Sequence, residues 1–166
     1  MAEESLPPTP VIKERQQSHA LPLVIKIAEV LLEVLIIGLI VDPFNSQLKI
    51  LNPAEKKLDD AGFVYTTVCG YLIINVIFII GYFLGDRIPK RTSLIFSSVG
   101  ACLHIAAASV MIRRWKRMTN SYIDYGMNNA VHSSKQYNDM LISASVFTFV
   151  NAVVFGVDVF ITMRFT

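Results

Sequence analysis

Four long apolar segments constrain this chain more than any other feature of its sequence. They are Leu21–Val41, Phe63–Leu84, Leu94–Ile112 and Met140–Met163. At about 1.5 Å rise per residue, each is long enough as a helix to cross the roughly 30 Å hydrocarbon core of a bilayer. Of the 166 residues, 53% are hydrophobic and only 17% are charged, which gives a soluble domain of this size too little polar surface. We therefore predict an integral membrane protein with four spans.

The pattern inside these segments predicts helices rather than barrel strands. Stretches such as EVLLEVLIIGLIV and GYLIINVIFIIGYFLG are continuously apolar apart from isolated polar residues, whereas barrel strands are short and alternate polar with apolar residues. The predicted fold class is all-α, a four-helix transmembrane bundle with short loops over residues 21–166. Residues 1–20 are polar and lack the basic start and short apolar core of a signal peptide, so we predict a disordered N-terminal tail and a retained first span.

The predicted loops are short. They are Asp42–Gly62, Gly85–Ser93 and Arg113–Asp139, and none can hold a soluble enzyme domain. Lysine and arginine residues are divided almost equally between the two sides of the membrane, so the positive-inside rule does not set the orientation. The cluster RRWKR, directly after the third span, favours an orientation that places the loop between the third and fourth spans in the cytoplasm.

The two cysteines, Cys69 and Cys102, both lie within spans, so they cannot form a disulfide between loops. We interpret them as small packing residues, in preference to palmitoylation or metal sites. Together with His104 they offer no metal-ligand set and no activated nucleophile at a known spacing. We therefore predict no catalytic, cofactor-binding or metal site, no small-molecule substrate and no nucleic-acid partner.

Polar residues inside the spans are the most informative positions. They are Lys26, Glu29, Glu33, Asn75, His104, Asn151 and Asp158. An ionisable group in hydrocarbon costs about 2.5–3.5 kcal/mol on insertion scales, so such groups face the bundle interior and find partners. Counted by depth, Lys26 and Asp158 lie nearer the membrane face of the N-terminus and the other five lie near the midplane. We expect Lys26 to pair with Asp158. If that pair does not form, Glu33 and His104 are the next couple to test, because they share the midplane and a neutral glutamate could hydrogen-bond the imidazole.

Two interpretations of these residues are open. One is a proton or ion path, because carboxylate and histidine chains serve this role in transporters. The other is a buried polar network that fixes the register and orientation of the helices. Transporters usually show broken helices and internal repeats at their sites, and this sequence shows neither. We favour the structural interpretation.

Small residues predict where helices approach closely. Gly81 and Gly85 form a GxxxG motif at the end of the second span, and Ser97 and Ala101 give the third span a small-residue face. We assign these four residues to helix packing. Because the sequence shows no catalytic or binding motif, we expect the protein to act by lateral association in the membrane. Its expected partners are membrane lipid and other membrane proteins, with a homo-oligomer as a further possibility.

Several short motifs resemble a known family. They are GYLI at Gly70–Ile73, the basic turn at Pro89–Arg91, Trp115 at the end of the third span, and Asn151 seven residues before Asp158. With the glutamates of IKIAEVLLEVLIIGLI, they resemble the MARVEL-type four-span membrane proteins, and among these the snakeskin-like septate-junction proteins of insects. The resemblance runs from about Leu23 to Phe165.

The resemblance implies a structural role rather than an enzymatic one. Snakeskin-like proteins assemble smooth septate junctions of arthropod gut epithelia with other membrane proteins and restrict paracellular diffusion. From this resemblance we expect a multi-pass plasma-membrane protein that lies at lateral cell junctions and has both termini in the cytoplasm. The alternatives are a MARVEL-type factor of vesicle trafficking or membrane fusion, and an accessory subunit or small transporter that uses the intramembrane carboxylates.

Overall fold

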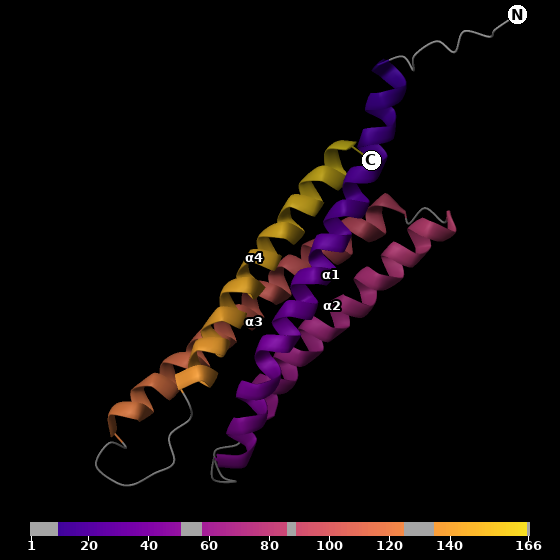
Figure 1. The fold of residues 1–166 in the computed structure, drawn as a ribbon. Helices are drawn as coiled ribbons and strands as arrows, with labels where there is room; N and C mark the ends of the chain where they lie inside the picture. Colours follow the sequence, from indigo (N-terminus) through magenta and orange to yellow (C-terminus); the bar gives the residue numbers. More distant parts are fainter. Residues whose placement is uncertain (1–9, 51–57, 86–88, 125–134, 166) are drawn as a thin grey trace, which may run out of the picture.

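The described part of the chain is entirely helical. The computed structural model describes residues 10–50, 58–85, 89–124 and 135–165. Four helices account for nearly all of them: α1 (Pro10–Ile50), α2 (Leu58–Leu84), α3 (Lys90–Asp124) and α4 (Lys135–Phe165) (Figure 1). The prediction of an all-α fold with four long helices is confirmed.

The helices are longer than the predicted spans. α1 begins at Pro10, so the second half of the predicted N-terminal tail is helical, while residues 1–9 lie outside the described residues. Proline is well suited to a first helical position, where its missing N–H is not needed. α1 also runs on to Ile50 and α3 to Asp124, into the predicted loops. A hydropathy window locates the apolar part of a helix, and polar residues can continue the same helix into water.

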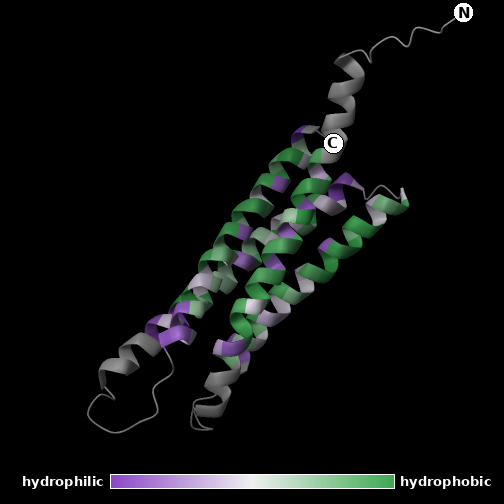
Figure 2. Ribbon diagram, in the orientation of Figure 1, coloured by the Kyte–Doolittle hydropathy of each residue, from purple (hydrophilic) through white to green (hydrophobic). Residues whose placement is uncertain are grey.

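Three of the four helices in the described chain are apolar and long enough to cross a membrane. The stretches are Asp59–Leu84 of α2, Lys90–Arg117 of α3 and Lys135–Arg164 of α4. α1 differs because Lys26, Glu29 and Glu33 interrupt its apolar segment. All three of these side chains are buried against the other helices, so the bundle shields them from lipid. α1 is thus the fourth member of a transmembrane bundle, and Figure 2 shows apolar residues along all four helices.

The helices are connected up and down, and each packs against the next in sequence. α4 also packs against α1, so the order around the bundle is α1, α2, α3, α4, with α1 opposite α3 and α2 opposite α4. The contact between α3 and α4 is the most extensive and that between α2 and α3 the smallest. α1 begins and α4 ends at the same end of the bundle, which we call the terminal end (Figure 1).

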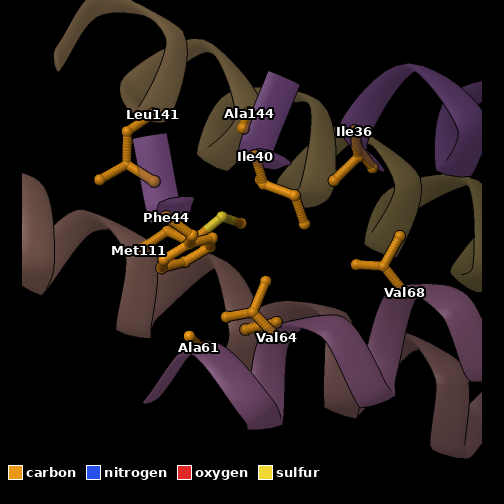
Figure 3. Close-up of a cluster of buried hydrophobic side chains, with 10 residues drawn as sticks. Ile36, Ile40, Phe44, Ala61, Val64, Val68, Met111, Leu141 and Ala144 are labelled. Carbon is orange, nitrogen blue, oxygen red and sulfur yellow. The ribbon is translucent and has the colours of Figure 1, made fainter. Parts of the chain in front are cut away.

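The interior changes character along the bundle. Toward the opposite end it is a hydrophobic core, in which Phe44 of α1, Val64 of α2, Met111 of α3 and Leu141 of α4 are fully buried (Figure 3). Toward the terminal end the interior contains the buried charged residues, together with the buried rings of Tyr71 and Phe155. Because lipid tails are as apolar as the core, close packing and interhelical hydrogen bonds hold such a bundle together more than the hydrophobic effect does.

Candidate functional site

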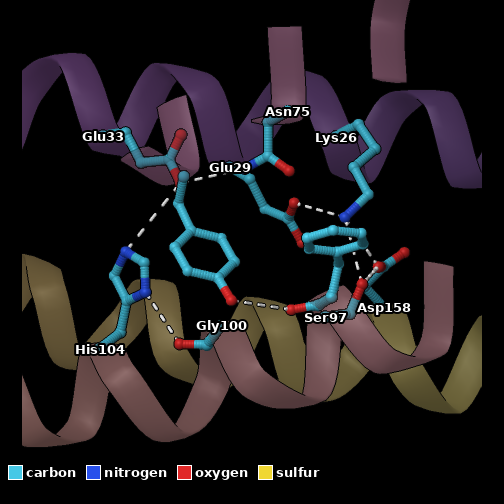
Figure 4. A network of polar contacts seen from close by, with 10 residues as sticks. Lys26, Glu29, Glu33, Asn75, Ser97, Gly100, His104 and Asp158 are labelled. Atoms are coloured by element: carbon cyan, nitrogen blue, oxygen red, sulfur yellow. Dashed lines mark hydrogen bonds and ion pairs between the residues drawn. The ribbon is translucent and has the colours of Figure 1, made fainter. Parts of the chain in front are cut away.

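The polar half of the interior is centred on Lys26 of α1. Its Nζ lies 2.8 Å from Oε2 of Glu29 and 2.9 Å from Oδ2 of Asp158, and it donates to Oγ of Ser97 at 3.3 Å. Three acceptors therefore surround the three N–H groups of the ammonium. Ser97 in turn donates to Asp158. The predicted ion pair between Lys26 and Asp158 is present, and it joins α1 to α4 (Figure 4).

Aromatic rings close this ion cluster. The Lys26 Nζ lies 5.4 Å from the ring centroids of both Phe78 and Phe155, within the range of a cation–π interaction. The charge is consequently held by two carboxylates, one hydroxyl and two ring faces. Lys26 does not extend to the lipid headgroups, although its position near the end of the apolar segment would allow a long side chain to do so.

A second group of polar contacts lies one helical turn further into the bundle. Asn75 Nδ2 of α2 donates to Oε1 of Glu33 at 3.0 Å. The same carboxylate oxygen lies 4.0 Å from Nε2 of His104 on α3. His104 Nδ1 lies 2.9 Å from the carbonyl oxygen of Gly100, which can only accept, so Nδ1 carries a hydrogen. Glu33 thus connects α1 with both α2 and α3 (Figure 4).

Gly100 allows the helices to approach closely beside this group. A Cβ atom at Gly100 would lie 2.7 Å from Cε1 of Tyr71, which is closer than real Cβ contacts, and 3.1 Å from the ring of Phe155, which is tighter than most. The Tyr71 ring packs edge-on against both His104 and Phe155, and its hydroxyl donates to the Phe96 carbonyl at 3.2 Å. The absence of a side chain at Gly100 is therefore what admits Tyr71 between α3 and α4.

Several buried polar atoms of the network have no hydrogen-bond partner among the described residues. They are Oε1 of Glu29, Oε2 of Glu33, Oδ1 of Asn75, Nε2 of His104, both amide atoms of Asn151, and Oδ1 of Asp158. All six residues are almost completely buried. Most of these atoms are acceptors, so the network holds more acceptors than hydrogens to fill them.

Residues 19–161 match the model of the MARVEL family, described as a membrane-associating domain. The chain belongs to the MARVEL family. The match includes all of α2 and α3, most of α1 and α4, and every residue of the polar network. No curated protein and no solved structure gives a significant match. The predicted MARVEL-type membrane protein is confirmed, and the more specific likeness to snakeskin-like proteins is taken up below as a proposal.

Two residues of this MARVEL domain that the sequence assigns to helix packing have other contacts. Ser97 is fully buried and bonded to the ion cluster, and only the partner helices reveal this. Gly85 lies just beyond α2 with φ +81°, and its N–H bonds to the Tyr82 carbonyl at 3.2 Å. This left-handed conformation ends a helix and favours glycine without any close neighbour. Ala101 and Gly81 are half-buried.

Counting residues along the helices groups Glu29 with Glu33 near the midplane of the membrane. In the structure the Glu29 side chain instead bonds to Lys26, in the ion cluster. A residue count along the axis locates the Cα atom, whereas the side chain reaches over a turn of helix to its partner. Cys69 is half-buried and Cys102 is exposed, and both are free.

Chemically, the network is suited to holding charges and protons. No group of three or more His, Cys, Asp or Glu side chains within the described ranges is arranged to hold a metal ion. The hydroxyl of Ser97 lies against Lys26 and Asp158. Every element contributes at least one polar side chain, so the arrangement links all four helices at the level of the membrane interior.

Proposed function

We propose that this MARVEL protein is a structural component of septate junctions, where it assembles with other membrane proteins into the epithelial paracellular barrier. The observation that carries the proposal is that the polar side chains inside the bundle bind one another: Lys26 pairs with Glu29 on its own helix and with Asp158 on α4, and Asn75 of α2 bonds to Glu33 of α1. The outer surface is apolar, as at Leu31 and Phe160, and suits lateral contacts in the membrane. The snakeskin-like motifs described above support the same role.

Localisation and barrier function test this proposal together. A tagged full-length chain in a polarised epithelium should concentrate at lateral junctions, and its depletion should increase the paracellular flux of a small uncharged tracer. Accumulation on intracellular vesicles would instead support a role in trafficking or fusion. A diffuse apical distribution with unchanged tracer flux would support an accessory or transport subunit, and either result would contradict the proposal.

The lateral partner is proposed to bind at the end of α2 that contains Gly81. This end of α2 exposes large apolar side chains, including Ile77, Ile80 and Leu84, and the contact between α2 and α3 as a whole is the smallest of the four helix–helix contacts. Gly81→Leu should reduce the co-purification of junction partners. Gly38→Leu is a matched control because Gly38 of α1 is exposed and has open space around it. Equal co-purification of the two variants, with both inserted normally, would contradict this interface.

The proposed topology has both termini in the cytoplasm. The even number of helices places the two ends together. The basic cluster at Arg113–Arg117 lies toward the opposite end and, taken alone, favours the reverse orientation. Arg114 of this cluster is partly engaged within the protein, because its guanidinium lies 5.0 Å from the Phe44 ring centroid. An N-terminal tag should bind antibody only in permeabilised cells, and labelling of intact cells would contradict this orientation.

A further inference from the structure

Glu33 and His104 face each other with two hydrogen-bond acceptors. Because Nδ1 of His104 donates to the Gly100 carbonyl, Nε2 of the neutral imidazole carries a lone pair. Oε1 of Glu33 lies 4.0 Å away and accepts from Asn75. Nε2 itself is buried and has no hydrogen-bond partner in the described structure. With Glu33 ionised and His104 neutral, no hydrogen lies between the two facing atoms, and Nε2 is left without a donor.

We propose that Glu33 and His104 form a buried binding site for a single proton. The proton comes from the aqueous phase and adds either to Nε2 or to the Glu33 carboxyl, and no bond between heavy atoms forms or breaks. In both positions the pair becomes one donor and one acceptor. The separation of 4.0 Å allows an ion pair and lets the contact shorten when the proton binds.

The charged groups around Glu33 and His104 favour the binding of a proton by this pair. On α1 it faces Glu29 and Lys26, and on α4 Asp158 lies in the same network, while α2 contributes the neutral Asn75 and Tyr71. Lys26 is bound to Glu29 and Asp158, so the one lysine of the network already faces two carboxylates. Glu33 is left without a cationic partner unless His104 provides it.

A second observation points to the same place. Asn151 of α4 is fully buried and close enough to Glu33 to interact with its carboxylate, but no bond of normal hydrogen-bond geometry joins them. Oε2 of Glu33 has no hydrogen-bond partner among the described residues. Glu33 therefore lies among polar side chains and keeps one carboxylate oxygen that can take up a proton. Three or more acidic, histidine or cysteine ligands for a metal ion are not grouped in the described part of the chain.

The site spans the bundle between helices that are not neighbours. α1 and α3 lie opposite each other, and Glu33 and His104 meet across this diagonal (Figure 4). A bound proton therefore closes a direct link between the two helices, and its release leaves two acceptors facing each other there. Proton occupancy consequently controls how firmly the centre of the bundle is held.

Nuclear magnetic resonance of the full-length protein in phospholipid nanodiscs tests the site. Histidine is labelled with ¹⁵N and glutamate with ¹³C at the carboxyl carbon. His19→Gln and His132→Gln leave His104 as the sole histidine, because the chain has three. The pair should hold one proton at neutral pH, and the signals of His104 and Glu33 should shift together as the pH is raised. Glu33→Gln identifies the carboxyl signal.

The two partners should also depend on each other. Glu33→Gln should change the proton affinity of His104, and His104→Gln that of Glu33, by about tenfold or more, the level at which two sites titrate as a unit. Ser109→Ala is the control, since this exposed hydroxyl bonds only to its own helix at Ile105 and should change neither titration.

Two results would overturn the proposal. One is an ionised Glu33 beside a neutral His104 throughout the pH range in which the protein is folded. The other is independent titration of the two groups, including a Glu33 signal that His104→Gln leaves unchanged. If a variant does not fold, the wild-type titration decides alone: a deprotonation step that appears in the signals of both groups supports the site, and a step that appears in one signal only refutes it.

Discussion

Lys26 contacts two carboxylates, Glu29 and Asp158, so replacing Lys26 should destabilise the protein more than replacing Asp158. Lys26→Leu leaves both Glu29 and Asp158 without their cation, whereas Asp158→Leu leaves the 2.8 Å contact between Lys26 and Glu29. Removing one partner of a buried pair costs about 3–5 kcal/mol. We therefore expect the free energy of unfolding to fall by about 3 kcal/mol in Asp158→Leu and by about 5 kcal/mol in Lys26→Leu.

The double variant measures the coupling itself. Lys26→Leu with Asp158→Leu should be less destabilised than the sum of the single changes, by about 0.5–3 kcal/mol. Unfolding by sodium dodecyl sulfate in mixed micelles can be followed through Trp115, the one tryptophan of the chain, which packs against the hydrophobic core. Val157→Leu, at the exposed neighbour of Asp158, should leave stability unchanged.

Additivity would refute this reasoning. If the double variant equals the sum of the singles within about 0.5 kcal/mol, Lys26 and Asp158 do not stabilise each other despite their 2.9 Å separation. Equal losses from the two single variants would refute the narrower claim that Lys26 balances two carboxylates.

Two further predictions concern packing, and each has its control in the same chain. Gly100→Ala should lower the free energy of unfolding by about 1–3 kcal/mol because its Cβ would lie 2.7 Å from the Tyr71 ring, whereas Gly156→Ala, with nothing within 4 Å, should be neutral or slightly stabilising in the same micelle titration. Met111→Ala should cost about 2–5 kcal/mol by opening a cavity, whereas Met163→Ala, at a side chain that is 63% exposed, should have little effect on the midpoint of unfolding.

The predicted spans and the observed helices agree in their centres and differ at their ends. The apolar segments locate α2, α3 and α4, because the cost of polar groups in hydrocarbon is large and local in sequence. The start of α1 at Pro10 and the end of α3 at Asp124 carry no such signal. Outside the membrane a helix and a polar loop differ little in hydropathy, so the sequence pattern does not separate them.

Some contacts of the candidate site could be predicted from the sequence and others could not. Lys26 and Asp158 could be paired from the sequence because both are charged, lie at one depth and must escape lipid. Ser97 could not be assigned to this pair, since a serine in a span is equally suited to close packing. Gly100 likewise gives no signal of its own, and its importance comes from the rings of Tyr71 and Phe155 on two other helices.

The sequence by itself determined that the chain is a four-helix membrane protein with its charges turned inward. That conclusion needs only the length of the apolar segments and the cost of charge in hydrocarbon. The tertiary structure alone decided which helices lie opposite each other, and hence that Glu33 and His104 lie across a diagonal of the bundle and that Ser97 of α3 joins the pair formed by Lys26 and Asp158. Such contacts depend on helix rotation and neighbour order, which side-chain packing between distant segments sets and which no local sequence pattern encodes.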